Sequence, residues 1–177
     1  MKRYVAFLRG INVSGHNLVK MDVLKEIFAM PGIKNIVTYI QSGNVVFDTR
    51  ETDNTTLEQK IETQLHKELG FPVRVIVRSI EEIKQTIVQS PFSETPEKGT
   101  HKLYISLFDT IPEAEKAIAL QTLCSGESEQ MYIAGATLYF ITPAYGNTKF
   151  SNNFVEKKLG VVATTRNWAT MNKVVTL

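Results

Sequence analysis

Thr38-Tyr39-Ile40-Gln41-Ser42-Gly43-Asn44-Val45-Val46-Phe47 is the stretch that decides the fold. Its first part continues a run, residues 36–40, that is rich in β-branched and aromatic side chains, which favour strands. Ser42-Gly43-Asn44 is typical of a tight turn, and Val45-Val46-Phe47 returns as a second strand. The stretch therefore predicts a β-hairpin.

Working outward, the flanking sequence places this hairpin between two helices and two further strands. Toward the N-terminus, residues 4–8 form a short apolar run, and a helix built on Val23, Leu24, Ile27 and Phe28 ends before Pro31-Gly32. Toward the C-terminus, apolar residues recur every four positions over 56–69, Gly70 follows, and residues 73–77 form another strand. The order β-α-β-β-α-β is that of a ferredoxin-like unit.

The second half of the chain repeats most of this order. A connecting helix over 80–88 precedes a polar stretch, after which the sequence predicts a strand (103–108), a helix (114–123), two strands (131–133 and 137–141), a helix (150–159), a short piece (161–163) and a last helix from Asn167. We therefore expect an α+β protein of two tandem ferredoxin-like (βαββα-type) subdomains with mainly antiparallel sheets. The expected boundaries are 1–89, with the connecting helix, a linker at 90–100, and 101–177, with the C-terminal helix.

Composition sets limits on the class of protein. The 177 residues are 43% hydrophobic and 21% charged, which is typical of a soluble globular chain. No apolar run approaches the roughly 20 residues that span a bilayer, and the apolar start is too short for a signal peptide. The single Cys124 excludes an internal disulfide and a thiolate zinc site. We expect a cytoplasmic protein with no membrane partner, no metal and no cofactor.

Two polar segments, one near each end, are the candidate functional motifs. The first is Leu8-Arg9-Gly10-Ile11-Asn12-Val13-Ser14-Gly15-His16-Asn17, and the second is Ala163-Thr164-Thr165-Arg166-Asn167-Trp168. Both ends of the chain are also basic: residues 1–20 contain four basic residues and no acid, and residues 149–177 contain five basic residues and one acid. Guanidinium and amide groups presented on loops are suited to anionic ligands. The predicted ligand-binding residues are Arg9, Asn12, His16, Asn17, Lys20, Arg166 and Asn167.

Other interpretations of these residues stay open. Gly10 and Gly15 are not a P-loop, since the lysine and hydroxyl residue that must follow the second glycine are absent. The asparagines can equally bond to their own loop, and Ser42-Gly43-Asn44 can be a turn alone or can lie against that loop. Asn167 suits a helix N-cap, and Trp168 is expected to anchor the last helix in the core. No catalytic residue is assigned.

The same residues also carry a family resemblance. Val5-Ala6-Phe7-Leu8-Arg9-Gly10-Ile11-Asn12-Val13, residues 38–47 and Thr164-Thr165-Arg166-Asn167-Trp168 resemble the bacterial family called domain of unknown function 1697. The resemblance spans essentially the whole chain and implies an α+β fold with duplicated ferredoxin-like halves. It implies no activity, substrate or catalytic residue. The chain departs from the family pattern at Ser14, His16, Ser90 and Ala169.

Three hypotheses follow for the function. The first is binding of a phosphate-bearing ligand, a nucleotide-like metabolite or a nucleic acid, at a basic site formed by the two motifs. The second is a small metal-independent enzyme for a phosphorylated metabolite with His16 as acid–base. The third is a structural or oligomer-forming protein whose polar segments bond only to each other.

Overall fold

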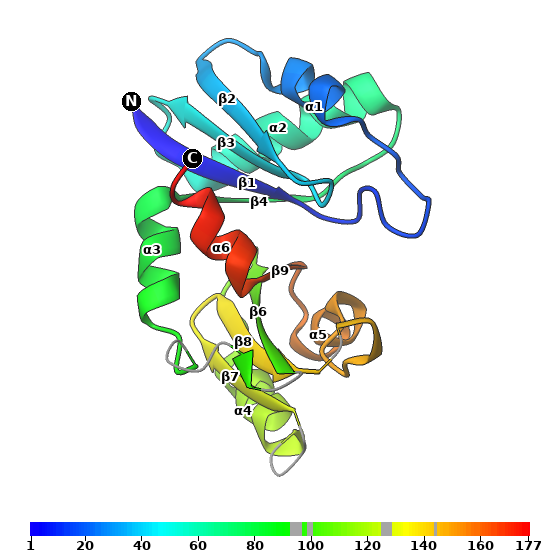
Figure 1. Cartoon of the computed structure of the whole chain (residues 1–177), viewed down its shortest axis with the longest axis vertical. Coiled ribbons are helices and arrows are strands. Elements are labelled where there is room, and N and C mark those ends of the chain that lie inside the picture. Colours follow the sequence, from blue (N-terminus) through cyan, green and yellow to red (C-terminus); the bar gives the residue numbers. More distant parts are fainter. Residues whose placement is uncertain (93–96, 99–100, 125–128, 144) are drawn as a thin grey trace. The chain divides into compact units, whose positions relative to one another are not determined.

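The computed structural model describes residues 1–92, 97–98, 101–124, 129–143 and 145–177 (Figure 1). It divides the chain into two compact units. Unit 1 comprises Met1–Lys84 and Val174–Leu177, and unit 2 comprises Gln85–Lys173. The expected linker at 90–100 lies partly outside the described residues. None of the described helices is long and apolar enough to cross a membrane.

Unit 1 has the predicted β-α-β-β-α-β order. Its elements are β1 (Lys2–Leu8), α1 (Met21–Phe28), β2 (Ile33–Tyr39), β3 (Asn44–Thr49), α2 (Asn54–Leu69) and β4 (Val75–Ser79). The sheet order is β2-β3-β1-β4, and every pair is antiparallel. The hairpin read from residues 36–47 is therefore the β2–β3 pair.

Both helices of unit 1 pack on one face of this sheet. Alternate residues of β1 and β3, among them Tyr4 and Phe47, belong to the same buried cluster as Leu24 of α1 and Ile61 of α2. This alternation is what a strand with one face against helices requires, because successive side chains point to opposite faces.

Unit 2 repeats the architecture. After α3 (Ile80–Val88), which runs from unit 1 into unit 2, come β5 (Glu97–Lys98), β6 (His101–Phe108), α4 (Ala114–Leu123), β7 (Gln130–Ala134), β8 (Thr137–Thr142), a 3₁₀ turn η1 (Tyr145–Asn147), α5 (Asn152–Leu159), β9 (Ala163–Asn167) and α6 (Trp168–Val174). The order β7-β8-β6-β9 matches that of unit 1, and β5 adds a short pairing at the start of β6. The predicted duplicated α+β fold is confirmed.

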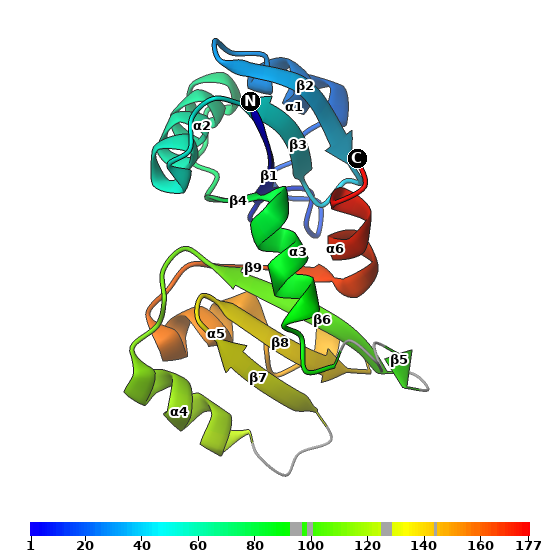
Figure 2. The ribbon, with the colours of Figure 1, turned by 90° about the vertical axis from the view of Figure 1, so that its left-hand side faces the viewer.

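One element was predicted wrongly. The polar segment at 163–167 is the edge strand β9 and not a loop, and α6 begins at Trp168. Thr164 and Thr165 are β-branched and suit a strand, and Ala163 and Thr164 are buried there. The core of unit 2 is formed by Phe108 and Phe140 of the sheet with Leu120 of α4 and Val155 of α5. Figure 2 shows α4 and α5 beside the strands of this sheet.

The two units share their local chemistry as well as their topology. Asp53 caps the N-terminus of α2, and Ser151 caps that of α5. Both helices end at a left-handed glycine, Gly70 with φ 77° and Gly160 with φ 71°. Glycine adopts this conformation without the steric cost of a Cβ, so both predicted helix stops are explained.

Equivalent hydrogen bonds close the ends of the two sheets. Leu8 N–H donates to Gly43 O and Phe108 N–H to Ala136 O, while Arg9 N–H donates to Arg74 O and Asp109 N–H to Val162 O. The residues that form these bonds differ in type between the two units, because the bonds involve backbone atoms alone. The main local difference is the connector after the first strand, which is residues 9–20 in unit 1 and only 109–113 in unit 2.

Candidate functional site

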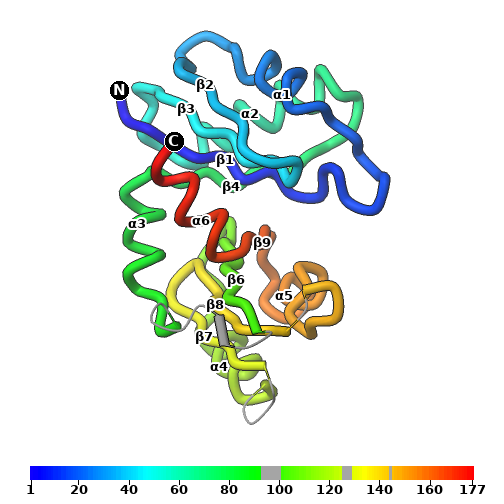
Figure 3. The backbone as a smooth tube through the Cα atoms, in the orientation of Figure 1, coloured from blue at the N-terminus to red at the C-terminus, as the bar shows by residue number. Residues whose placement is uncertain are grey.

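The longer connector of unit 1 contains a small hairpin, here called the finger (residues 12–17). Asn12 N–H donates to Asn17 O at 3.1 Å, and His16 N–H donates to Val13 O at 2.9 Å. Ser14 and Gly15 between them both have positive φ, 50° and 78°. Two such residues form a type I′ turn, whose twist suits a two-residue hairpin. Figure 3 follows this backbone between β1 and α1.

The finger is anchored on both sides by buried side chains. Ile11 and Val19 belong to the core of unit 1. Ile11 packs so closely on Gly43 that a Cβ added there would lie 2.6 Å from Ile11 Cδ1. The turn between β2 and β3 therefore lies against the base of the finger. Of the two possibilities that the sequence left open, a turn alone or a turn that contacts the loop, the structure has the second.

The amide of Asn12 holds the finger to that turn. Its Nδ2 donates to Val19 O at 2.9 Å and to Gln41 O at 2.8 Å, and its Oδ1 accepts from Val19 N–H at 2.8 Å. Asn17 Nδ2 donates to Gly10 O at 3.1 Å. Asn12 and Asn17, two of the predicted ligand-binding residues, thus bond to the backbone of unit 1 and fix the shape of the loop.

The cationic residues of the loop lie further out. His16 and Lys20 are exposed, and Arg9 is half-buried at the end of β1. Neither the His16 imidazole nor the Lys20 ammonium has a bonding partner among the residues that the structure describes. Lys20 occupies the N-cap of α1 and makes no side-chain cap bond, so this helix start receives no acceptor from its own cap residue.

Arg166 lies in a different setting, on the edge strand of unit 2. Its side chain is buried, and it donates to Thr164 Oγ1 at 3.0 Å and to Thr165 O at 2.8 Å. Burial lowers the pKa of the guanidinium from its ordinary value to about 10, and the charge of nearby Tyr145 opposes that shift. It therefore stays protonated at neutral pH.

A second arginine, missed in the sequence, occupies the equivalent place in unit 1. Arg78 is the fourth residue of β4 as Arg166 is of β9, and it too donates to the carbonyl of the preceding residue, Val77 O, at 2.7 Å. Arg78 also pairs with Glu58 at 3.6 Å. An arginine followed by a helix-capping residue at the end of the last strand is the signal that could have revealed it.

The residue after each arginine caps a helix. Asn167 Oδ1 accepts from Thr170 N–H at 2.8 Å, which confirms the predicted N-cap of α6. Trp168 was predicted to anchor that helix but is only half-buried. The buried positions of α6 are Thr170, Met171 and Val174, a stripe that does not include Trp168.

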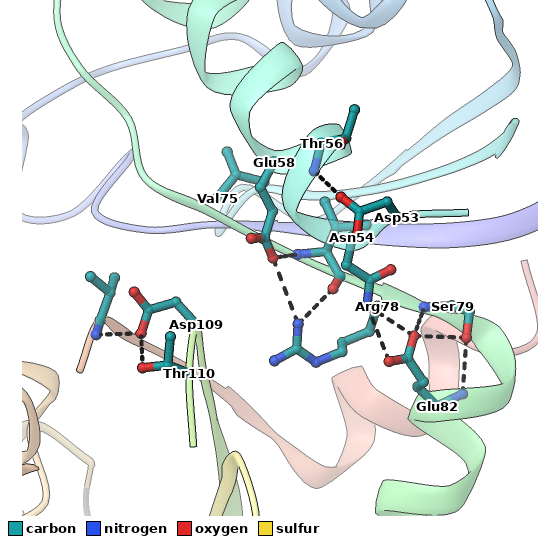
Figure 4. A network of polar contacts seen from close by, with 12 residues as sticks. Asp53, Asn54, Thr56, Glu58, Val75, Arg78, Ser79, Glu82, Asp109 and Thr110 are labelled. Carbon is teal, nitrogen blue, oxygen red and sulfur yellow. Dashed lines mark hydrogen bonds and ion pairs between the residues drawn. The ribbon is translucent and has the colours of Figure 1, made fainter. Parts of the chain in front are cut away.

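The counterpart in unit 1 is a capping box at the start of α3 (Figure 4). Ser79 Oγ accepts from Glu82 N–H at 3.2 Å, while Glu82 Oε2 accepts from Ser79 N–H at 2.7 Å and from Ser79 Oγ–H at 2.8 Å. Asn54 Nδ2 donates to the same carboxylate at 3.1 Å. The pattern Ser-x-x-Glu before an apolar run is the sequence signal for this motif.

These bonds set the charge of Glu82. Burial alone would raise the pKa of its carboxyl group, but the hydrogen bonds from Ser79 and Asn54 and the charge of Arg78 outweigh it, and the pKa lies below its ordinary value of 4.5. Over the part of the chain that the structure describes, no group of His, Cys, Asp and Glu side chains could hold a metal ion.

The predicted site residues therefore fall into two groups. Arg9, Asn12, His16, Asn17 and Lys20 come together in and around the finger of unit 1, whereas Arg166 and Asn167 are neighbours on β9 of unit 2. The first group is a shaped and exposed basic loop. The second consists of a buried arginine and a helix cap.

Comparison with known proteins agrees with this fold and adds no activity. A conserved bacterial protein, SP0830 from Streptococcus pneumoniae, has a similar solved structure with a TM-score of 0.71 and 22% identity, over 99% of this chain and 97% of that one. The search of curated proteins gave no match. The family model described as "Protein of unknown function (DUF1697)" matches residues 1–139, and the chain therefore belongs to that family.

Proposed function

We propose that this protein binds a nucleic acid through the finger and the basic residues around it. The observation that carries the proposal is an exposed hairpin held by its own backbone hydrogen bonds, with Arg9 before it, Lys20 after it and no acidic residue between them. A loop held in place before binding loses little conformational freedom when a ligand arrives. Its cationic side chains attract phosphates over a range set by the ionic strength.

The exposure of the loop favours a polymer over a small phosphorylated metabolite. Val13 is 57% exposed, Leu18 is 72% exposed, and His16 and Lys20 are exposed as well. Small-molecule sites usually bury most of their ligand in a concave pocket. A projecting two-stranded ribbon instead has the width that enters the major groove of DNA, with flanking cations against the phosphates.

The finger gives less support to the hypothesis of an enzyme that uses His16 as acid–base than to nucleic-acid binding. A general base needs a partner that orients its ring, and the described residues give His16 none. The amides that were candidates for ligand contact, Asn12 and Asn17, act in our proposal as positioning residues. Arg9, His16 and Lys20 make the contacts.

The test is a fluorescence anisotropy titration of the full chain with labelled single- and double-stranded oligonucleotides of about 20 nucleotides at several salt concentrations. We expect the logarithm of the affinity for duplex DNA to fall linearly with the logarithm of salt, with a slope of about 0.9 per phosphate contacted. Lys20→Ala should weaken binding to all sequences and reduce that slope by about 1.

Lys157→Ala is the matched control, because Lys157 is an exposed lysine of α5 in unit 2. It should leave both affinity and slope unchanged. The proposal fails if the affinity is insensitive to salt, or if Lys20→Ala and His16→Ala bind as tightly as the unmodified protein. Equal losses for Lys20→Ala and Lys157→Ala would show only non-specific attraction to charge and would also reject the finger as the site.

A further inference from the structure

A second feature of unit 1 lies away from the finger, at the start of β1. A cavity of about 500 Å³ opens between β1, the β3–α2 connection and the first turn of α3. Its lining is largely polar and includes Tyr4, Thr52, Asn54, Ser79, Glu81 and Glu82. This volume falls in the range of pockets that hold small molecules.

Tyr4 is the most buried of the residues that line this cavity. The residue is only 2% exposed, and its ring stacks on Phe47 with the centroids 6.1 Å apart. Within the described residues its hydroxyl group makes no hydrogen bond, although Tyr4 lines the cavity. The hydroxyl is not among the fully enclosed polar atoms of the described residues, so it is accessible from the cavity and available to a ligand.

The duplicated unit offers an internal comparison for this position. Tyr104 is paired in its sheet as Tyr4 is, and it stacks on Phe140 at 5.6 Å as Tyr4 stacks on Phe47. In unit 2 a second ring, Tyr145 of η1, also packs on Tyr104 at 5.1 Å. The connection before α2 in unit 1, residues 50–53, has no aromatic residue, and Tyr4 borders the cavity instead.

The charge around the Tyr4 hydroxyl is negative. Burial raises the pKa of Tyr4, and the charges of Glu82, Glu51 and Glu81 raise it further. The hydrogen bonds from Ser79 and Asn54, drawn in Figure 4, favour the ionised form of Glu82. Glu81 is exposed, and its carboxylate makes no bond within the described part of the chain.

Cationic groups of the first three residues, Met1, Lys2 and Arg3, also line this cavity. Arg3 donates to Asp48 Oδ1 at 2.7 Å and to Leu177 O at 2.8 Å, so its guanidinium is already engaged on the far side. Lys2 and the Met1 α-ammonium are exposed and remain to meet an anionic group on a ligand. The carboxylates and the tyrosine hydroxyl together suit a donor that carries positive charge.

We propose that this cavity binds a small molecule bearing a protonated amino group, which donates to Glu81 and to the hydroxyl of Tyr4. The site is separate from the finger and does not depend on its function. A simple amine and an amino acid share this chemistry, and an amino acid would in addition place its carboxylate near Lys2.

The experiment is a titration of the full ¹⁵N-labelled chain with propylamine, glycine and uncharged 1-propanol, followed by amide chemical shifts. We expect propylamine or glycine to produce saturable shifts at residues of β1 and α3, and 1-propanol to produce none. Tyr4→Phe keeps the ring and its stack but removes the hydroxyl, and Glu81→Gln removes one charge at the surface. Each should weaken binding by about tenfold, the effect of one charge-assisted hydrogen bond.

Tyr104→Phe and Glu115→Gln, the second an exposed carboxylate of α4, are the matched controls and should leave binding unchanged. The proposal is overturned if no compound shifts these amides, if 1-propanol binds as well as propylamine, or if Tyr4→Phe and Glu81→Gln both bind like the unmodified chain. Glu81 is exposed, so its variant is expected to fold even if the Tyr4 variant does not.

Discussion

Asn12 combines two requirements of the finger in one residue. Its backbone has φ 54°, a left-handed conformation that costs most side chains about 1–2 kcal/mol but that asparagine tolerates better. Its amide offers a donor and an acceptor on one planar group, and the loop uses both ends. The residue therefore has a structural reason to be asparagine even before any ligand is considered.

This double role predicts the outcome of two substitutions. Asn12→Ala should lower the free energy of unfolding by about 3 kcal/mol, because it removes the amide bonds and places a Cβ at positive φ. Asn12→Gly removes the same bonds without the backbone cost and should lose only about 2 kcal/mol. Urea denaturation measures both. Equal losses would mean that the backbone carries no strain, and a loss below about 0.5 kcal/mol in either would contradict the bonding role.

Glu82 predicts a dependence of stability on pH. Its pKa in the folded chain lies below 4.5, its ordinary value, so the unfolded chain binds the proton first as the pH falls. The stabilisation is complete above about pH 4.5 and is lost as the pH drops through the lowered folded value.

Urea unfolding between pH 7 and pH 3 tests this dependence. We expect Glu82→Gln to be less stable at pH 7 and to show a shallower fall toward pH 3 than the unmodified chain. Glu26→Gln, at an exposed carboxylate of α1, should follow the unmodified curve. A Glu82→Gln curve parallel to the original would show that its bonds in Figure 4 do not favour the ionised form.

At the scale of elements, side chains from the helices close the outer edge of each last strand. Val75 and Val77 of β4 donate their N–H groups to Glu62 and Glu58, two carboxylates one turn apart on α2. Ala163 of β9 donates to Glu156 of α5 in the same way. Covering an exposed edge prevents pairing with another chain. The two units therefore share these hydrogen bonds from helix carboxylates to the edge strand as well as their strand order.

The helix ends allow a direct test of this equivalence. A Cβ added at Gly70 meets nothing within 4 Å, and one at Gly160 meets only Lys116 Nζ at 3.7 Å. Gly70→Ala and Gly160→Ala should therefore each cost about 1 kcal/mol, from the left-handed backbone alone. Gly70→Asn should cost less. Thermal denaturation measures all three, and markedly unequal alanine penalties would show that the two caps are not equivalent.

The sequence predicted these elements well where local chemistry decides them. The β2–β3 hairpin, the four-residue apolar spacing of α2 and the stops at Gly70 and Gly160 are local patterns, and all are present. Strand β9 was missed because Thr164-Thr165-Arg166 reads as polar, and only the tertiary fold buries it. Propensity is overridden in such cases by packing.

The same distinction between local patterns and tertiary packing applies to the candidate site. The finger was placed in a loop because Gly10 precedes it and Gly15 lies within it, but its hairpin depends on Ser14 adopting a positive φ, which no propensity signals. The structural bonds of Asn12 reach Gln41 across the β2–β3 turn, a pairing that sequence spacing does not indicate. Arg166 could be picked out as unusual, but its burial and its equivalence to Arg78 arise only from the tertiary fold.

At the scale of the molecule, unit 1 is built from both ends of the chain. Residues 174–177 belong to it, and Arg3 Nε donates to Leu177 O at 2.8 Å although the two residues are 174 positions apart. Contacts between distant segments carry a loop-closure cost that must be offset by burial and bonding. Val174, which is fully buried, supplies such burial at the start of the segment.

Removing residues 174–177 should therefore lower the free energy of unfolding by roughly 2–4 kcal/mol, because a buried valine and the acceptor of Arg3 are lost together. Removing only 176–177 keeps Val174 and should cost about 1 kcal/mol, the value of one hydrogen bond to a charged group that stays partly solvated. Urea unfolding followed by circular dichroism measures both truncations. If the longer truncation costs no more than the shorter one, Val174 does not support the fold, and the return of the chain to unit 1 is held by the Arg3 bond alone.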